Sequence, residues 1–151
     1  PHAIRPWQHV LEPLAGYLRL AECLAGADGD AFAEGWNLGP ADEDCRPVAD
    51  LVERLARGWG GGAGWQLSQR THPHEATCLK VDASKARARL GWDRRRPLDT
   101  ALGWTAAWYR AAASGADPRA LAAAEIARYE ALGQPGDRAG VRAGVQAGVQ
   151  A

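Results

Sequence analysis

The side chain best suited to bind an anion stands near the start of the sequence, in the stretch RPWQHV. Arg5 carries a planar guanidinium with five N–H donors, which fit the oxygens of a phosphate group. Trp7 offers an aromatic surface beside it. Pro6 disfavours the helical conformation at Arg5, so this stretch is predicted to be extended. An ordinary surface ion pair between Arg5 and Glu12 is the alternative that the residues alone leave open.

A second polar stretch, THPHEATC, groups side chains that could bind a metal. It supplies the imidazole, carboxylate and thiolate groups that zinc prefers, from His72, His74, Glu75 and Cys78. In an extended segment both imidazoles share one face and Glu75 points away, and no second ligand pair follows. A polar loop that touches a ligand is therefore favoured over a metal site. Cys78 is predicted to be a small buried hydrophobic residue.

The glycine run GWGGGAG matches the spacing of a dinucleotide-binding loop at Gly58, Gly61 and Gly64. Such a loop needs a strand before the glycines and the beginning of a helix after them. The order predicted here is helix, glycines, strand, so we interpret the run as a simple turn without a bound cofactor. No serine stands in a nucleophile-elbow motif and no cysteine has the surroundings of a nucleophile, so no catalytic residue is assigned.

Charge balance, hydropathy and cysteine content bear on the classes of function that the chain could have. The 151 residues include 18 basic and 18 acidic side chains, so net charge gives no reason to expect nucleic-acid or membrane-surface binding. No apolar run approaches the roughly 20 residues of a membrane-spanning helix, and the first residues do not resemble a signal peptide. Three widely spaced cysteines do not suggest a disulfide framework. A cytoplasmic location is expected.

Apolar residues recur at helical spacing in several segments, whereas the apparent strands are short. Helices are predicted over residues 12–24, 48–59, 83–90, 98–109 and 118–132. Strands are predicted over residues 32–38, 65–69 and 77–82. Asp82 or Ser84 should cap the helix that Gly91 ends, and Asp117 with Pro118 should begin the last helix. Asn37, near the end of a predicted strand, is usually a turn-forming residue.

From residue 133 the composition changes to AGVRAGVQAGVQA, which lacks large apolar groups and is predicted to be a disordered tail over 133–151. Residues 1–132 then form one partial domain. The expected fold class is α/β: a helix-rich lobe with short strands and no complete Rossmann domain. Its strands are too few for an independent sheet, so they are interpreted as parts of a larger one.

Four motifs occur in an order and at a spacing that resemble a known family: RPWQHVLEPLAGYL, WNLGPADEDCRPV, HPHEATCLKVDASKARARLGW and LDTALGWTAAWY. Over about residues 3–131 the chain is similar to the C-terminal portion of CDP-glucose 4,6-dehydratases, which are extended short-chain dehydrogenases/reductases. RPWQHVLEP and HPHEA are fairly specific to these dehydratases. SKARARLGW and LDTAL also occur in related epimerases, so a fragment of an epimerase is an alternative.

The resemblance implies a two-lobed lyase, often a homodimer, that acts on a nucleotide sugar. An N-terminal Rossmann lobe would bind NAD, and a smaller C-terminal lobe would close over CDP-glucose. The product would be CDP-4-keto-6-deoxyglucose, a precursor of deoxysugars in surface glycans. By position, Arg5 resembles the arginine that contacts the pyrophosphate, and Asn37 resembles an asparagine in the same neighbourhood. His74 would line the nucleotide end, and Glu12 would have a structural role.

Two family signatures have no counterpart in this sequence. No glycine-rich loop follows a first strand, and the catalytic Tyr-x-x-x-Lys is not found, because Tyr17, Tyr109 and Tyr129 are each followed four positions later by alanine or glycine. We therefore expect the chain alone to bind no NAD and to be inactive. A companion chain would supply the Rossmann lobe, or the chain is truncated, as the lack of methionine also hints.

Two further hypotheses remain open from the sequence. One is a non-catalytic module that binds a nucleotide sugar or another anion. The other is a partner-docking protein, in which an exposed hydrophobic face would contain Trp7, Trp36 and Trp108.

Overall fold

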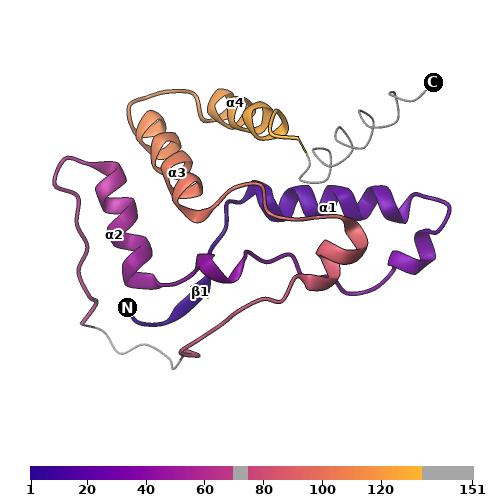
Figure 1. Ribbon diagram of the computed structural model, residues 1–151. Coiled ribbons are helices and arrows are strands. Elements are labelled where there is room, and N and C mark those ends of the chain that lie inside the picture. The colour runs from indigo at the N-terminus through magenta and orange to yellow at the C-terminus, as the bar shows by residue number, and fades with distance from the viewer. Residues whose placement is uncertain (70–74, 134–151) are drawn as a thin grey trace, which may run out of the picture.

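The computed structural model describes residues 1–69 and 75–133, and this part of the chain is mostly helical (Figure 1). The α-helices are α1 (Leu11–Leu24), α2 (Val48–Trp59), α3 (Leu98–Ala113) and α4 (Pro118–Glu130). The short helical turns are η1 (Gly29–Phe32), η2 (Asp42–Asp44) and η3 (Ala86–Leu90). The strands are β1 (Ile4–Pro6) and β2 (Cys45–Pro47). None of the described helices has the length and apolar character needed to cross a membrane.

Local signals fixed the helix ends close to their predicted positions. The carboxylate of Asp117 accepts hydrogen bonds from the backbone N–H groups of Arg119 (3.1 Å) and Ala120 (3.3 Å), and Pro118 occupies the first helical position. Asp82 accepts from the backbone N–H of Ser84 at 2.8 Å. The predicted caps are therefore confirmed. Three bounds differ by more than one residue: η3 begins at Ala86 rather than residue 83, α3 extends to Ala113 rather than residue 109, and α4 ends at Glu130 rather than residue 132.

The predicted strands are wrong in most of their length. Residues 29–32 form η1, and neither 33–38 nor 65–69 is a strand. Trp36 donates its indole N–H to the Phe32 carbonyl at 2.9 Å, and the two rings stack, so this segment is closed into a turn by local contacts. Of residues 77–82, Cys78 alone forms a bridge, to Ile4. An extended segment becomes a strand only where another segment pairs with it, and pairing is non-local.

The strands that do form make one antiparallel pair. Ile4 lies opposite Pro47, Arg5 opposite Arg46 and Pro6 opposite Cys45. The helix-rich character with short strands is confirmed, but the described sheet contains β1 and β2 alone. The predicted tail lies outside the described residues, except for Gly133.

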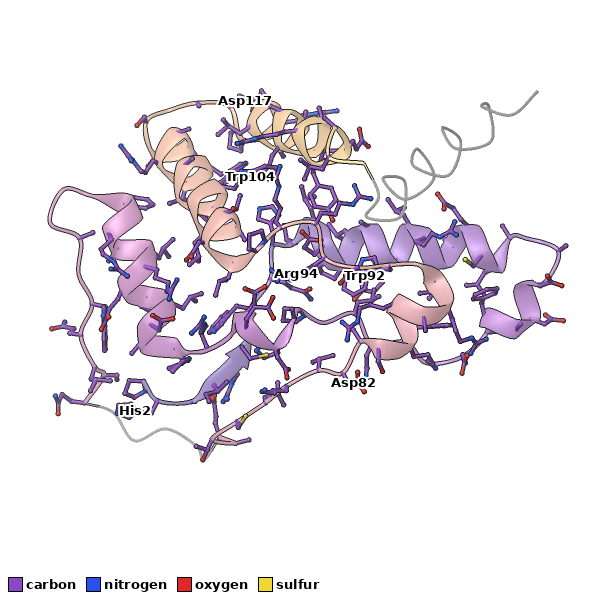
Figure 2. The ribbon with its side chains drawn as sticks, in the orientation of Figure 1. His2, Asp82, Trp92, Arg94, Trp104 and Asp117 are labelled. Carbon is purple, nitrogen blue, oxygen red and sulfur yellow. The ribbon has the colours of Figure 1, made fainter. Side chains whose placement is uncertain are left out.

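The core lies in two groups of elements. α1 contacts η1 and η3, around the cluster of Ala83, Ala86, Leu90 and Trp92, whereas α3 packs against α2 and α4 (Figure 1). Figure 2 shows Trp92 beside α1 and Trp104 between α3 and α4. The most deeply buried apolar residues are Ala83, Ala86, Leu90, Trp92, Leu98, Ala101, Trp104, Ala106 and Tyr129.

Glu12, in the first turn of α1, connects α1 to other parts of the core through hydrogen bonds. Its side chain is fully buried, and its carboxylate accepts from the backbone N–H groups of Arg95 (2.9 Å) and Arg96 (3.0 Å). The Tyr129 hydroxyl donates to the same carboxylate at 2.8 Å. Burial and this hydrogen bond raise the pKa of Tyr129 well above its ordinary value. These contacts agree with the structural role expected for Glu12.

Candidate functional site

Arg5 lies in the middle of β1, which is held on both edges. On one edge β1 pairs with β2. On the other, the Ile4 N–H donates to the Thr77 carbonyl at 2.9 Å, and the Leu79 N–H donates to the Ile4 carbonyl at 3.0 Å. The predicted extended conformation of this stretch is confirmed at residues 4–6. Segments far apart in the sequence thus fix the backbone of Arg5.

The guanidinium of Arg5 is oriented by the segment that contains Glu75. Nη1 donates to the carbonyls of Ile4 (2.8 Å) and Ala76 (2.9 Å), and Nη2 donates to Glu75 Oε2 at 2.7 Å. The Arg5 ion pair is therefore with Glu75, and the alternative partner Glu12 is wrong. Among the described residues, the Nε–H and the second N–H of Nη2 make no hydrogen bond.

The ion pair between Arg5 and Glu75 is open to solvent on the carboxylate side. The Arg5 side chain is 19% exposed, whereas that of Glu75 is 76% exposed. An ion pair in such surroundings contributes only about 0–1 kcal/mol. A ligand anion could therefore replace Glu75 at low cost, using the hydrogen-bond donors that Arg5 still has free in the described part of the chain.

Arg46 is a residue of this site that the sequence analysis did not identify. It lies directly opposite Arg5 in the β1–β2 pair and is exposed. Its carbonyl accepts the indole N–H of Trp7 at 2.9 Å, which places Trp7 beside the same strand pair. A signal was present, because both strands carry an Arg-Pro pair, in IRP and CRP.

The structure does not bring Asn37 into contact with Arg5. Asn37 is exposed in an irregular segment and makes no side-chain hydrogen bond with the described residues. The two segments are linked nearby, since the Gln8 Nε2 donates to the Leu38 carbonyl at 2.8 Å. Asn37 thus stands directly before Leu38, which is hydrogen-bonded to the segment after β1, but no described residue orients the Asn37 amide.

His74 and His72 lie outside the described residues, so their predicted contacts remain predictions. Cys78, predicted to be buried, is exposed. It bridges to Ile4 at the edge of the strand pair, where none of the described elements covers it. Within the described ranges no three His, Cys, Asp or Glu side chains come together as metal ligands.

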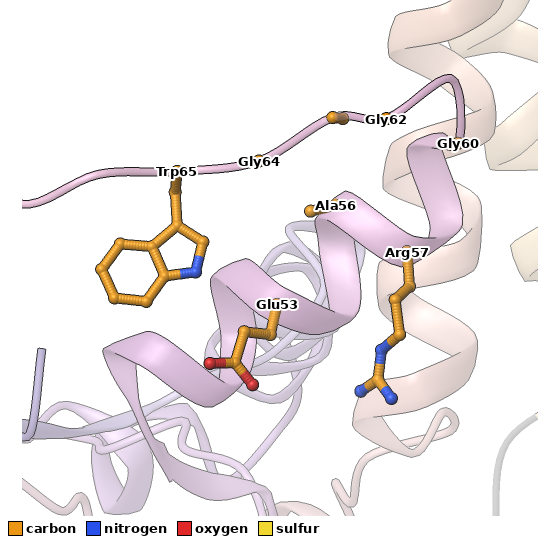
Figure 3. Close-up of a pocket in the computed structure, with 8 residues that line it drawn as sticks. Glu53, Ala56, Arg57, Gly60, Gly62, Gly64 and Trp65 are labelled. Carbon is orange, nitrogen blue, oxygen red and sulfur yellow. The ribbon is translucent and has the colours of Figure 1, made fainter.

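The glycine run follows the C-terminal end of α2. Gly60, Gly61 and Gly62 have positive φ angles of 78°, 64° and 75°, which favour glycine. No helix begins in residues 60–69, so the predicted order of helix before glycines is confirmed, while the predicted strand after them is wrong. Figure 3 shows the open hollow of about 580 Å³ between this loop and α2, with Trp65 on the loop side.

The tryptophans predicted to form an exposed face are instead half-buried: Trp7, Trp36 and Trp108. The Trp36 ring is covered by Lys85 Nζ at 4.6 Å and by the Arg89 guanidinium at 5.2 Å. Exposed apolar side chains lie on α1 and the residue before it and on α4: Val10, Leu14, Tyr17, Leu18 and Ile126. Two hollows of about 470 and 290 Å³ share Leu11, Leu14 and Ile126 on that surface.

Comparison with known proteins connects this geometry to a class of enzyme. No protein-family model matches the chain. The chain is 46% identical over 129 residues to a protein of Salmonella typhimurium LT2 described as CDP-glucose 4,6-dehydratase. The match covers 85% of this chain and 36% of the relative, so the chain spans about a third of the length of the curated relative it matches. The resemblance to CDP-glucose 4,6-dehydratases inferred from the sequence motifs is confirmed.

Proposed function

We propose that this chain is the substrate-binding part of a CDP-glucose 4,6-dehydratase and that Arg5 binds the diphosphate of the nucleotide sugar. The observation that carries the proposal is a guanidinium fixed on β1, with N–H donors left free by the described residues, in a chain 46% identical to such an enzyme over 129 residues. Phosphate oxygens accept paired N–H groups of arginine in charge-assisted hydrogen bonds.

Two further residues are proposed as substrate contacts. Asn37 offers an exposed amide after Trp36, in a segment that Gln8 attaches to β1. His74 directly precedes Glu75, the ion-pair partner of Arg5. His74 is therefore the sequence neighbour of the residue that a ligand would replace on Arg5.

The whole reaction would convert CDP-glucose to CDP-4-keto-6-deoxyglucose with NAD, in the cytoplasm, as a step toward surface glycans. The described residues do not fit NAD, because the glycine run follows a helix instead of preceding one. We propose that a Rossmann lobe binds NAD and supplies the redox chemistry. The apolar surface of α1 and α4 is the candidate contact for that lobe or for a second copy of the chain.

Ligand-induced stabilisation tests the proposal. CDP or CDP-glucose should raise the Tm of the full chain, since a ligand at 100 times its Kd stabilises the folded state by about 2.7 kcal/mol. Arg5→Ala should remove this rise, because the guanidinium is lost. Arg110→Ala is the matched control, since Arg110 is exposed on α3 and its side chain has no partner among the described residues. A Tm rise that survives in Arg5→Ala would contradict the assignment of Arg5.

A second candidate is a non-catalytic nucleotide-sugar or anion-binding module. It requires only the N–H donors that Arg5 has free among the described residues. Mixing the chain with a Rossmann lobe of a CDP-glucose 4,6-dehydratase and measuring 4-keto sugar separates the two candidates. Sugar turnover in the mixture supports the dehydratase. Binding of CDP-glucose without turnover, with both partners folded, supports the module, and a preference for another nucleotide sugar supports a fragment of an epimerase.

A further inference from the structure

We propose that Arg46 is a second phosphate-binding residue, which together with Arg5 forms a clamp for a diphosphate. The inference rests on the proposed function, because it adds a residue to the same site. Neither the sequence motifs nor the similarity to the Salmonella enzyme assigns a role to Arg46. It follows from the pairing of β1 with β2 and from the charges around that pair.

The two arginines are placed side by side by the register of the strands. Arg5 and Arg46 are directly opposite each other in an antiparallel pair. Residues in this relation project to the same face of the sheet, with their Cβ atoms about 4.5–5.5 Å apart. A proline follows each arginine and favours the extended backbone at both positions. The two side chains therefore leave the strand pair on one face.

The charges of this pair are not balanced by the described residues. Like charges directly opposite each other destabilise a strand pair. Glu75 compensates Arg5, but Arg46 is exposed and its guanidinium makes no hydrogen bond or ion pair with the described residues. The acidic residues just before it are paired elsewhere: Asp42 with Lys80, and Glu43 and Asp44 with Arg94. The strand pair thus presents excess positive charge to a ligand.

Two separate guanidiniums favour two linked phosphoryl groups over a single one. Each arginine presents a planar fork of N–H donors, and that of Arg5 is turned toward Ala76 and Glu75, on the edge of β1 opposite β2. One fork can take each phosphoryl group of a diphosphate, whereas a monophosphate has one group to share. The indole N–H of Trp7 on the Arg46 carbonyl holds the strand pair together at this point. The ligand class that fits two arginines is therefore a diphosphate ester.

The test compares CDP with CMP on the full chain by titration calorimetry. We expect Arg46→Gln to weaken CDP binding at least tenfold and CMP binding less than twofold, so that the preference for CDP collapses. Arg46→Lys should recover part of the CDP affinity, because it keeps the charge without the fork. Arg110→Gln, an exposed arginine on α3, should leave both affinities unchanged. Without ligand, Arg46→Gln should have a Tm equal to or higher than that of the parent chain, because a like-charge contact is removed.

The outcomes separate this inference from the function on which it rests. If the parent chain binds CDP and Arg46→Gln binds it equally well, the clamp is wrong and the role of Arg5 stands. If Arg46→Gln weakens the binding of CMP and CDP equally, Arg46 does not contact the second phosphoryl group, and the clamp is also wrong. A lower Tm of ligand-free Arg46→Gln would mean that Arg46 supports the fold, against the proposal. No CDP binding by the parent chain would overturn the proposed function and the clamp with it.

Discussion

Among single residues, Glu12 shows how this chain places a charge in its interior. A buried carboxylate is costly unless hydrogen bonds replace its hydration. Here the backbone N–H groups of Arg95 and Arg96 and the Tyr129 hydroxyl supply those bonds, from two segments distant in the sequence. The carboxylate therefore connects the beginning of α1, the segment before α3 and the end of α4. Removing one donor should affect the whole of this junction.

Tyr129→Phe is expected to lower the free energy of unfolding by about 1.5–3 kcal/mol, the usual range for a hydrogen bond to a charged group. Urea unfolding followed by circular dichroism measures this loss. Tyr109→Phe is the matched control, because Tyr109 is 57% exposed and should change stability by no more than about 0.5 kcal/mol. Equal effects of the two substitutions would argue against the buried hydrogen bond.

The same pair of variants gives a pH signature. The pKa of Tyr129 is raised in the folded chain above its ordinary value near 10, by burial and by Glu12. The unfolded chain therefore loses this proton first, and the contribution of Tyr129 to stability is present below about pH 10 and falls as the pH rises further. The slope approaches about 1.4 kcal/mol per pH unit for one group. Tyr129→Phe should show a shallower alkaline loss than Tyr109→Phe.

At the scale of elements, the short helix η3 depends on the residue that ends it. Gly91 has a φ angle of 64°, in the left-handed region, and its surroundings leave room for a methyl group. Any cost of a side chain there is thus conformational rather than steric. Gly103, within α3, also has free space around it but no positive φ angle.

Alanine should have opposite effects at these two glycines. Gly91→Ala is expected to destabilise the chain by about 1 kcal/mol, because alanine is unfavourable in the left-handed region. Gly103→Ala is expected to stabilise it by about 0.5–1 kcal/mol, because alanine is the better helix former. Thermal unfolding of both variants checks the signs. A stabilising Gly91→Ala would contradict the left-handed conformation at the end of η3.

For the molecule as a whole, the core is small, and Trp92, 2% exposed, is the more deeply buried of its two tryptophans. Its ring packs with Ala83, Ala86 and Leu90, and its indole N–H donates to the Glu12 carbonyl at 3.1 Å. Partly buried residues of α1, η1 and the segment after it pack on the same cluster. Several elements thus share one contact surface, while other apolar side chains remain exposed on α1 and α4.

Trp92→Ala should destabilise the whole described fold rather than one element. The expected loss is about 3–5 kcal/mol, which is a large part of the stability of an ordinary domain. Far-UV circular dichroism at 25 °C should show lost helix, or a much lower Tm. Trp65→Ala is the control, because Trp65 is 41% exposed on the glycine loop and should change little. Native-like helix content and Tm in Trp92→Ala would contradict the central position of this residue.

The sequence by itself determined where the helices lie, several of their ends and the family resemblance. The caps at Asp82, Asp117 and Gly91 act within a few residues, so their signals can be read locally. The extended backbone of Arg5 was likewise predictable from Pro6, its neighbour. Short motifs were enough to identify the similarity to CDP-glucose 4,6-dehydratases.

Tertiary structure alone decided which extended segments pair and which side chains meet. The opposition of Arg5 and Arg46, the ion pair of Arg5 with Glu75 and the bond of Tyr129 to Glu12 join residues 41, 70 and 117 positions apart. Cys78 lies beside β1 and is nevertheless exposed, which its residue type alone does not predict. A helix cap makes its hydrogen bonds to residues two or three positions away. A strand or a buried charge obtains its hydrogen bonds only from a distant segment that the fold places beside it.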